Sequence, residues 1–320
     1  RRGTRPGSDA TNRVRIHWGL SARNRAEPGP AARIATPAAL SPSPAERYTT
    51  AMSRFRFDLF TLPAAAETLR REVRDFLATE LAGYPPAKRA HTWTGWDPEF
   101  TRKVAARGWI GMTWPRQYGG HERSAFERYV VLEEMLAAGA PVAAHWIGDR
   151  QSGPLLLRFG TEAQRQAILP GVCAGGNFFC IGMSEPDSGS DLASIRSRAR
   201  REGDGWLLNG TKVWTTGAFG CDYMIALFRT DVVPEKKHAG LSQFLVPLRT
   251  PGISIRPIRD LSGNEHFCEV TFEDALIPAD TLVGSEGNGW SQVMAELAYE
   301  RSGPERYLSS YPLLVELVRA

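Results

Sequence analysis

The sequence contains no hydrophobic run long enough to cross a bilayer. Its longest candidate, residues 130–148, is interrupted by Glu133, Glu134 and His145, so we expect no membrane span. Cysteine is also scarce, and the four cysteines show no metal-ligand spacing and no sign of disulfides (Cys173, Cys180, Cys221 and Cys268). We therefore expect no metal site, and a reducing cytoplasm is the simplest location for the protein.

Residues 1–52 contain no lysine. They carry nine arginines and three acidic residues, which gives a net charge of +6. The whole chain has a formal net charge of +4, so +4 minus +6 leaves −2 for the remaining residues. The basic character belongs to this segment rather than to a folded face, which argues against a nucleic-acid-binding protein. Because the segment is rich in Arg, Ala, Pro, Gly and Ser, we expect it to be a disordered tail.

Two interpretations of this tail remain open. It begins without Met, and Met52 looks more like a natural start, which favours a disordered tail or read-through from a misplaced start. A transit peptide would also be rich in Arg and poor in acidic residues, but the many prolines argue against an amphipathic targeting helix.

The next part of the chain has helical spacing. With 320 residues, of which 42% are hydrophobic and 23% charged, the chain can form a soluble globular protein of at least two domains. Apolar residues at helical spacing from Leu69 to Leu81 predict a first helix. Start signals, including two capping boxes, predict further helices at Asp97, Ser124 and Thr161. The last of these should end before Pro170. We expect an N-terminal α-helical bundle over residues 53–175.

The composition then changes to that of strands. Residues 176–285 predict a middle antiparallel β-barrel or sandwich, with strands at Asp222–Phe228, Ser242–Leu248, Ile253–Ile258 and Glu269–Ile277. Pro257 should place its strand at a sheet edge. Helical spacing resumes over residues 286–320, which indicate the start of a truncated C-terminal helical domain. The fold class is thus a multidomain α+β protein.

The stretch from Phe178 to Ala218 carries the strongest functional signal. A strand-like run ends in the polar loop Ser184–Asp191, whose backbone N–H groups and hydroxyls suit a phosphate, a carbonyl or the polar edge of a planar cofactor. A turn at Gly203-Asp204-Gly205 then leads into two short strands. Trp214 and Thr216 lie two apart on the second strand, so their side chains should emerge on the same side.

These motifs resemble a known family. The pairing of SEPDSGSD with NGTKVWTTG is similar to the flavin-binding core of acyl-CoA dehydrogenases, whose usual wording is close to TEPGAGSD followed by NGxKxWIT. Residues 108–120, GWIGMTWPRQYGG, resemble a family loop near the acyl pocket, although the loop is equally compatible with a packed connection. The resemblance extends from about residue 57 to the C-terminus and implies the order of α-bundle, β-domain and further helices.

The resemblance implies FAD as cofactor and an acyl-CoA as substrate. Trp214 would pack near the flavin, and Thr216 would hydrogen-bond close to its reactive nitrogen. Contacts to the flavin are implied for the segments Ile181, Gly182, Met183, Ser184 and Trp214, Thr215, Thr216. Ser190 and Arg301 would contact CoA. Asp187 stands where the family has glycine and adds a negative charge where the polyanionic CoA is expected.

The reaction implied is FAD-dependent α,β-dehydrogenation of an acyl-CoA to a 2-enoyl-CoA, with electrons passed to an electron-transfer flavoprotein. In isovaleryl-type and long-chain-type enzymes the base precedes an arginine on the first C-terminal helix, which here gives Glu300 before Arg301. Gly303 and Pro304 should interrupt that helix one turn later. The alternative is a carboxylate beyond residue 320, because the family fold ends in a helical bundle that this chain would lack.

Two other functions share the fold. One is a flavin monooxygenase or oxidase, and the other is a catalytically silent subunit of a heteromeric dehydrogenase. The resemblance also implies a dimer or homotetramer for the full-length protein.

Overall fold

The computed structural model describes residues 60–301 and 303–320. The chain divides into two units, residues 1–59 and 60–320, and only the second is described below. The tail predicted over residues 1–52 lies outside the described residues.

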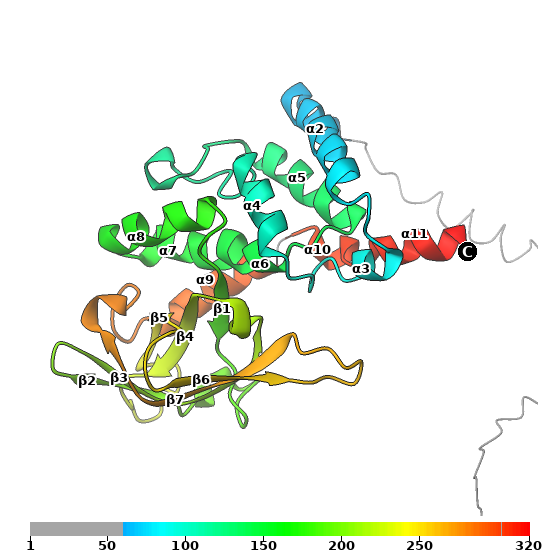
Figure 1. Cartoon of the computed structure of the whole chain (residues 1–320). Helices are drawn as coiled ribbons and strands as arrows, with labels where there is room; N and C mark the ends of the chain where they lie inside the picture. Colours follow the sequence, from blue (N-terminus) through cyan, green and yellow to red (C-terminus); the bar gives the residue numbers. More distant parts are fainter. Residues whose placement is uncertain (1–59, 302) are drawn as a thin grey trace, which may run out of the picture. The chain divides into compact units, whose positions relative to one another are not determined.

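Helices make up the first part of this unit (Figure 1). They are α2 (Ala64–Glu80), α3 (Pro86–Ala90), α4 (Pro98–Ala106), η1 (Arg116–Tyr118), α5 (Ala125–Ala138), α6 (Ala143–Ile147), the π-helical segment η2 (Gly148–Ser152), α7 (Gly153–Phe159) and α8 (Glu162–Cys173). The predicted capping boxes of α5 and α8 are both present, and Asp97 accepts a hydrogen bond from the backbone N–H of Phe100. The N-terminal α-helical bundle is therefore confirmed.

Pro170 does not end α8, as the sequence had indicated, since the helix continues to Cys173. A proline inside a helix removes one backbone hydrogen bond. Burial of Leu169, Val172 and Cys173 beside the proline offsets this loss.

A seven-stranded sheet follows the helices (Figure 1). Its strands are β1 (Phe179–Gly182), β2 (Arg198–Glu202), β3 (Gly205–Thr216), β4 (Tyr223–Arg229), β5 (Leu241–Pro247), β6 (Ile253–Ile258) and β7 (Phe267–Pro278). The order is β1-β4-β2-β3-β7-β6, and β5 pairs with β4. Pro257 lies on the edge strand β6, as predicted.

The sheet is mixed rather than purely antiparallel. β1 pairs with β4 in parallel, and β2 meets β4 in one parallel pair, Arg198 with Arg229. The other pairings are antiparallel. The two short strands expected over residues 206–216 form the single strand β3, which has two register shifts.

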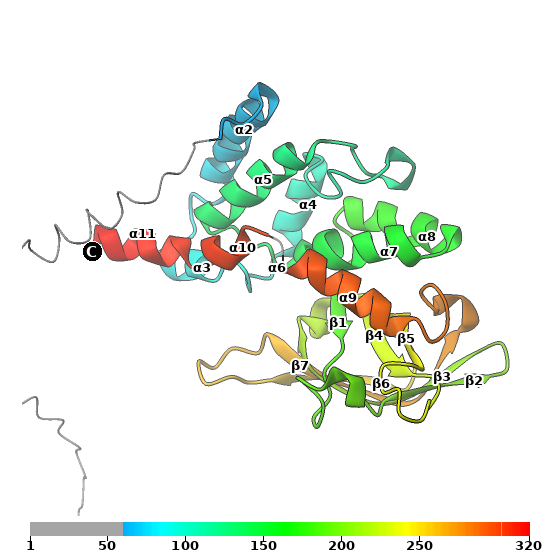
Figure 2. The same cartoon turned by 180° about the vertical axis from the view of Figure 1, so that it is seen from behind.

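Three helices follow the sheet: α9 (Gly289–Glu300), α10 (Glu305–Leu308) and α11 (Tyr311–Arg319). α9 lies between the sheet and the first helices, where it packs on β5, α7 and η2 (Figure 2). The helical core also includes Phe179, Ile225 and Leu245 of the sheet. Helices and sheet therefore meet along one apolar interface with α9 beside it.

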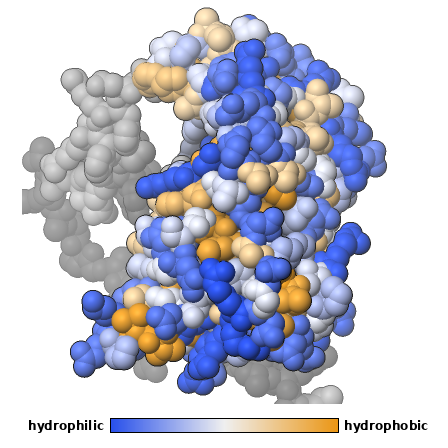
Figure 3. Space-filling view, turned by 90° about the vertical axis from the view of Figure 1, so that its left-hand side faces the viewer, coloured by the Kyte–Doolittle hydropathy of each residue, from blue (hydrophilic) through white to orange (hydrophobic). Residues whose placement is uncertain are grey.

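The surface is mainly hydrophilic on the face drawn in Figure 3, where hydrophobic residues form separate groups. α11 differs, because it exposes four large apolar side chains (Leu313, Leu314, Leu317 and Val318). Among the described residues, no helix is both long and apolar enough to cross a membrane.

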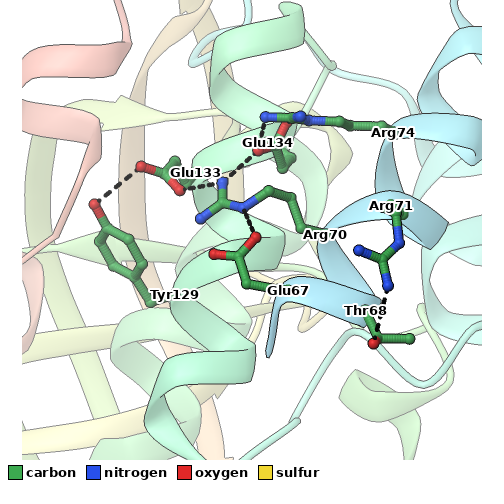
Figure 4. Close-up of polar contacts among 8 residues, drawn as sticks. All are labelled: Glu67, Thr68, Arg70, Arg71, Arg74, Tyr129, Glu133 and Glu134. Atoms are coloured by element: carbon green, nitrogen blue, oxygen red, sulfur yellow. Dashed lines mark hydrogen bonds and ion pairs between the residues drawn. The ribbon is translucent and has the colours of Figure 1, made fainter. Parts of the chain in front are cut away.

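A partly buried ion network joins α2 to α5 (Figure 4). Arg70 donates to Glu133 at 2.6 Å and to Glu134, and Arg74 donates to both oxygens of Glu134 at 2.8 and 2.9 Å. Glu134 is buried, so the two guanidinium groups supply the charge that its carboxylate requires.

Candidate active site

A cavity of about 240 Å³ lies between the sheet, the first helices and α9. Its lining residues are Trp93, Ala143, Trp146, Ile147, Gln151, Ile181, Met183, Ser184, Val213, Trp214, Thr216, Glu296, Leu297 and Glu300. Three separate parts of the chain thus contribute to one site, and both sequence motifs reach it.

Backbone contacts join the two motifs. The N–H of Val213 on β3 donates to the carbonyl of Ser184 at 2.9 Å, and Lys212 Nζ donates to the carbonyl of Met183 at 3.1 Å. The polar loop after β1 is therefore fixed against β3, which places Ser184 beside Trp214 in the cavity wall.

A buried ion pair reinforces this connection. Lys212 is fully buried, and its Nζ lies 2.8 Å from Oε1 of Glu185. Burial lowers the pKa of Lys212 to about 8, against the opposing effect of Glu185. Burial alone would raise the pKa of Glu185, but the Lys212 charge and the N–H groups of Arg196 and Ser197 outweigh it and lower the pKa. Both groups are consequently charged at neutral pH.

Trp214 sits at a bulge in β3. Lys212 pairs with Val270, and Thr215 pairs with Cys268. Between these two pairs β3 advances by three residues and β7 by two, so β3 has one extra residue. Trp214 takes a positive φ of 60° there and keeps 58% of its surface exposed. The strand therefore does not alternate regularly between Trp214 and Thr216, yet the bulge brings both into the cavity lining.

The first helices form the second wall. Trp93 and Trp146 meet edge to face with ring centroids 4.6 Å apart, and both line the cavity. η2 carries Gln151, which is buried and also lines it. A π-helical turn advances the chain by one extra residue and so changes which side chains face the cavity.

α9 forms the third wall and supplies two carboxyl groups, Glu296 and Glu300, one turn apart. Glu300 ends the helix, because the chain is interrupted before α10 at Glu305, as Gly303 and Pro304 predicted. Arg306 Nη2 donates to Glu300 Oε1 at 2.9 Å and to the Glu300 carbonyl at 3.0 Å. Glu300 is thus held by an arginine at the edge of the cavity.

Glu296 has a different environment. It is only 2% exposed, and Gln243 Nε2 donates to its Oε2 at 2.9 Å, while its Oε1 has no partner among the described residues. Burial raises the pKa of Glu296 to about 8, and the neighbouring Glu300 charge adds to the increase. The Glu296 carboxyl is therefore mainly protonated at neutral pH.

Six of the predicted site residues line the cavity: Ile181, Met183, Ser184, Trp214, Thr216 and Glu300. Four do not. Gly182 is buried, and a Cβ there would lie 2.3 Å from the sulfur of Met224. Thr215 is buried, and its hydroxyl has no partner in the described part of the chain. Ser190 and Arg301 are exposed outside this cavity.

Glu296, Gln151 and the tryptophans of the helical wall line the cavity but were not among the predicted site residues. The spacing of Glu296 and Glu300, four residues apart on one helix, was the available signal for the second carboxyl. The loop at residues 108–120 does not line the cavity. Asp149 accepts the N–H of Gly111 at 2.7 Å, which ties the loop to η2.

The residues present fit a flavin. An isoalloxazine ring needs a flat apolar wall and a few hydrogen-bonding groups along one edge. The cavity lining offers the exposed Trp214 ring and Met183, together with the hydroxyls of Ser184 and Thr216. The buried hydroxyl of Thr215, which lacks a partner within residues 60–301 and 303–320, lies on the same strand.

Comparison with known proteins gives a consistent result. The profile described as "Acyl-CoA dehydrogenase, N-terminal domain" matches residues 63–176, and the one described as "Acyl-CoA dehydrogenase, middle domain" matches residues 180–275. The chain is 39% identical to acyl-CoA dehydrogenase IpdE1 of Mycobacterium tuberculosis over 73% of its own length and 63% of that protein. It is 36% identical to IpdE1 of Mycolicibacterium smegmatis, over 79% and 70%. A solved structure, "Tcur3481-Tcur3483 steroid ACAD G363A variant", superposes with a TM-score of 0.72 at 34% identity, over 81% of this chain and 67% of that one.

Proposed function

The chain belongs to the acyl-CoA dehydrogenase family, and on this premise we propose that it takes part in FAD-dependent α,β-dehydrogenation of an acyl-CoA to the 2-enoyl-CoA. The observation that carries the proposal is the carboxylate of Glu300 in the same cavity as Trp214, Thr216 and Ser184. A base and a flavin-type wall thus line one pocket. The chain spans about two thirds of the length of these relatives, so substrate and partners are part of the proposal.

Each wall has a role in the proposed reaction. Trp214 and Met183 would hold the flavin ring, and Ser184 and Thr216 would hydrogen-bond its edge. The chemistry that FAD supplies when bound is acceptance of a hydride from the β-carbon of the acyl group. Glu300 would take the proton from the α-carbon, whose C–H electrons become the new double bond.

Glu300 is better suited to this role than Glu296. A general base must be deprotonated at working pH. Glu296 is mainly protonated at neutral pH, whereas Glu300 is ion-paired with Arg306 at the cavity edge. Binding of an acyl chain beside Leu297 would remove water from the Glu300 carboxylate and strengthen it as a base.

Replacement of the base tests the proposal. In FAD-loaded protein, Glu300→Gln should keep the flavin and still bind acyl-CoA, but lower the rate of anaerobic flavin bleaching by about 100- to 10,000-fold. Glu316→Gln is a matched control, because Glu316 is also a helix carboxylate paired with an arginine but lies outside the cavity. Near-normal flavin bleaching in the Glu300→Gln variant would indicate that another residue is the base. Oxygen consumption without enoyl product would indicate an oxidase instead.

The partners belong to the same proposal. We propose an electron-transfer flavoprotein as electron acceptor and a dimer or tetramer as the assembly. The solved relative carries two protein names, Tcur3481 and Tcur3483, which supports testing for a second, different subunit. Co-purification from the source cell and the mass of the assembly would distinguish a homo-oligomer from a heteromer. A cytoplasmic location is proposed because all four cysteines are free and buried.

A further inference from the structure

The cavity holds more buried polar groups than the proposed reaction uses. Ser184 and Thr216 are assigned to the flavin edge, and Glu300 to the α-proton. Gln151 and Glu296 line the same cavity, with 7% and 2% of their surface exposed, and have no part in that chemistry.

Both side chains have unused hydrogen-bonding capacity. Oε1 of Glu296 is buried without a partner in the described residues, although Oε2 is held by Gln243. Within the same part of the chain, no residue hydrogen-bonds to the side-chain amide of Gln151. A buried polar atom without a partner costs about 1–3 kcal/mol. Oε1 of Glu296 therefore indicates a ligand that supplies the missing bond, and the side-chain amide of Gln151 lines the same cavity.

Gln151 and Glu296 come from two elements that meet at the cavity. Gln151 lies on η2 and Glu296 on α9, and these two elements pack against each other. Glu296 precedes Glu300 by four residues, which is about 6 Å along the helix axis. A polar site there is one helical turn away from the proposed base.

The protonation state of Glu296 defines what the site would bind. A protonated carboxyl donates a hydrogen bond, and an amide both donates and accepts. An oxygen that accepts hydrogen bonds satisfies both groups. A purely aliphatic acyl chain would leave them unpaired and dehydrated, and a second carboxylate would meet the Glu300 charge nearby.

We infer, on the basis of the proposed function, that the acyl group of the substrate carries a hydroxyl or ketone oxygen away from the thioester, which Gln151 and Glu296 hydrogen-bond. The two residues then determine specificity, while Glu300 carries out the proton transfer. The cavity would favour oxygenated acyl-CoA thioesters over unsubstituted ones of the same length.

Matched pairs of substrates test this inference. Straight-chain acyl-CoAs are compared with their hydroxy and oxo counterparts of equal length, with the oxygen placed at each position from C4 to C8. Affinity is followed by quenching of tryptophan fluorescence, since Trp93, Trp146 and Trp214 line the cavity, and reactivity by anaerobic flavin bleaching in FAD-loaded protein. We expect one oxygen position to raise kcat/KM at least about tenfold, the value of one hydrogen bond to a buried polar group.

Three variants connect this preference to the residues. Glu296→Leu and Gln151→Leu should each remove most of the preference, whereas Glu296→Gln keeps a donor and should retain it. Gln292→Leu is the control, because Gln292 is a buried glutamine on the same helix that holds Val283 and does not line the cavity. It should lower stability and leave the preference unchanged.

The outcomes separate the two hypotheses. Equal binding and bleaching for every matched pair, or a preference that survives both leucine variants, would overturn the specificity inference while leaving dehydrogenation intact. Failure of every acyl-CoA, oxygenated or not, to bleach the flavin would overturn the proposed function itself. A preference lost equally in Gln292→Leu would show that α9 packing, not the polar pair, selects the substrate.

Discussion

The buried pair of Lys212 and Glu185 offers a sharp test of how the site is held together. Lys212→Met keeps an unbranched side chain of similar length but removes the positive charge. Glu185 would remain buried, with the N–H groups of Arg196 and Ser197 at 2.6 and 3.0 Å but no counter-charge. Removal of one partner from a buried ion pair costs about 3–5 kcal/mol. We expect a loss near the lower end of that range, because those two hydrogen bonds persist.

Urea unfolding at pH 7 measures this cost as a lower midpoint with an unchanged slope. The loss should shrink in acid, where the unpaired Glu185 takes up a proton and no longer needs a partner. Arg256→Met is the comparison, because Arg256 forms an ion pair with Glu269 on the same sheet but is largely exposed, so its loss should be much smaller. Equal stability of Lys212→Met and the parent protein would refute the view that this pair fixes the loop against β3.

Three single positions give further tests. Thr216→Val should change the absorption spectrum of bound FAD and alter stability by no more than about 1 kcal/mol; an unchanged spectrum and rate would make Thr216 only a strand residue. The pKa of Glu296 is about 8 in the fold against 4.5 ordinarily, so its stabilising effect is complete below pH 4.5 and lost as the pH rises through 8. Relative to Glu296→Gln, the parent should therefore lose about 3–4 kcal/mol of unfolding free energy between pH 5 and pH 8, measured by thermal unfolding at both pH values. Gly153→Ala should lower the unfolding temperature by overpacking worth about 1–3 kcal/mol, because the new Cβ would lie 2.1 Å from the Trp114 ring.

Local signals in the sequence predicted the elements well. Capping boxes at Ser124 and Thr161 involve residues three apart, so the bonds they form are visible in the sequence itself. Pro257 is also a local signal. Proline has no backbone N–H to donate to a neighbouring strand, so it indicates an edge strand. The predicted end of α8 was wrong, because burial of the helix against its neighbours outweighed the local cost of Pro170.

Non-local contacts account for what the sequence did not predict. Lys212 and Glu185 are 27 residues apart, and nothing in their spacing indicates a buried pair. The parallel pairing of β1 with β4 likewise depends on the path of the chain between them. Gln151 lies on a π-helical turn, which changes which side chains face the cavity. No recognisable residue pattern predicts such a turn.

The two glutamates of α9 show why residue type and spacing alone could not define the site. Glu296 and Glu300 share a helix face and line one cavity, yet their partners differ. Gln243 holds Glu296 in a buried, mainly protonated state, whereas Arg306 forms an ion pair with Glu300 at the edge. Neighbouring carboxyl groups in unlike environments can take the separate roles of donor and base. This division of roles comes from β5 and α10, which supply Gln243 and Arg306 from outside the helix that carries both acids.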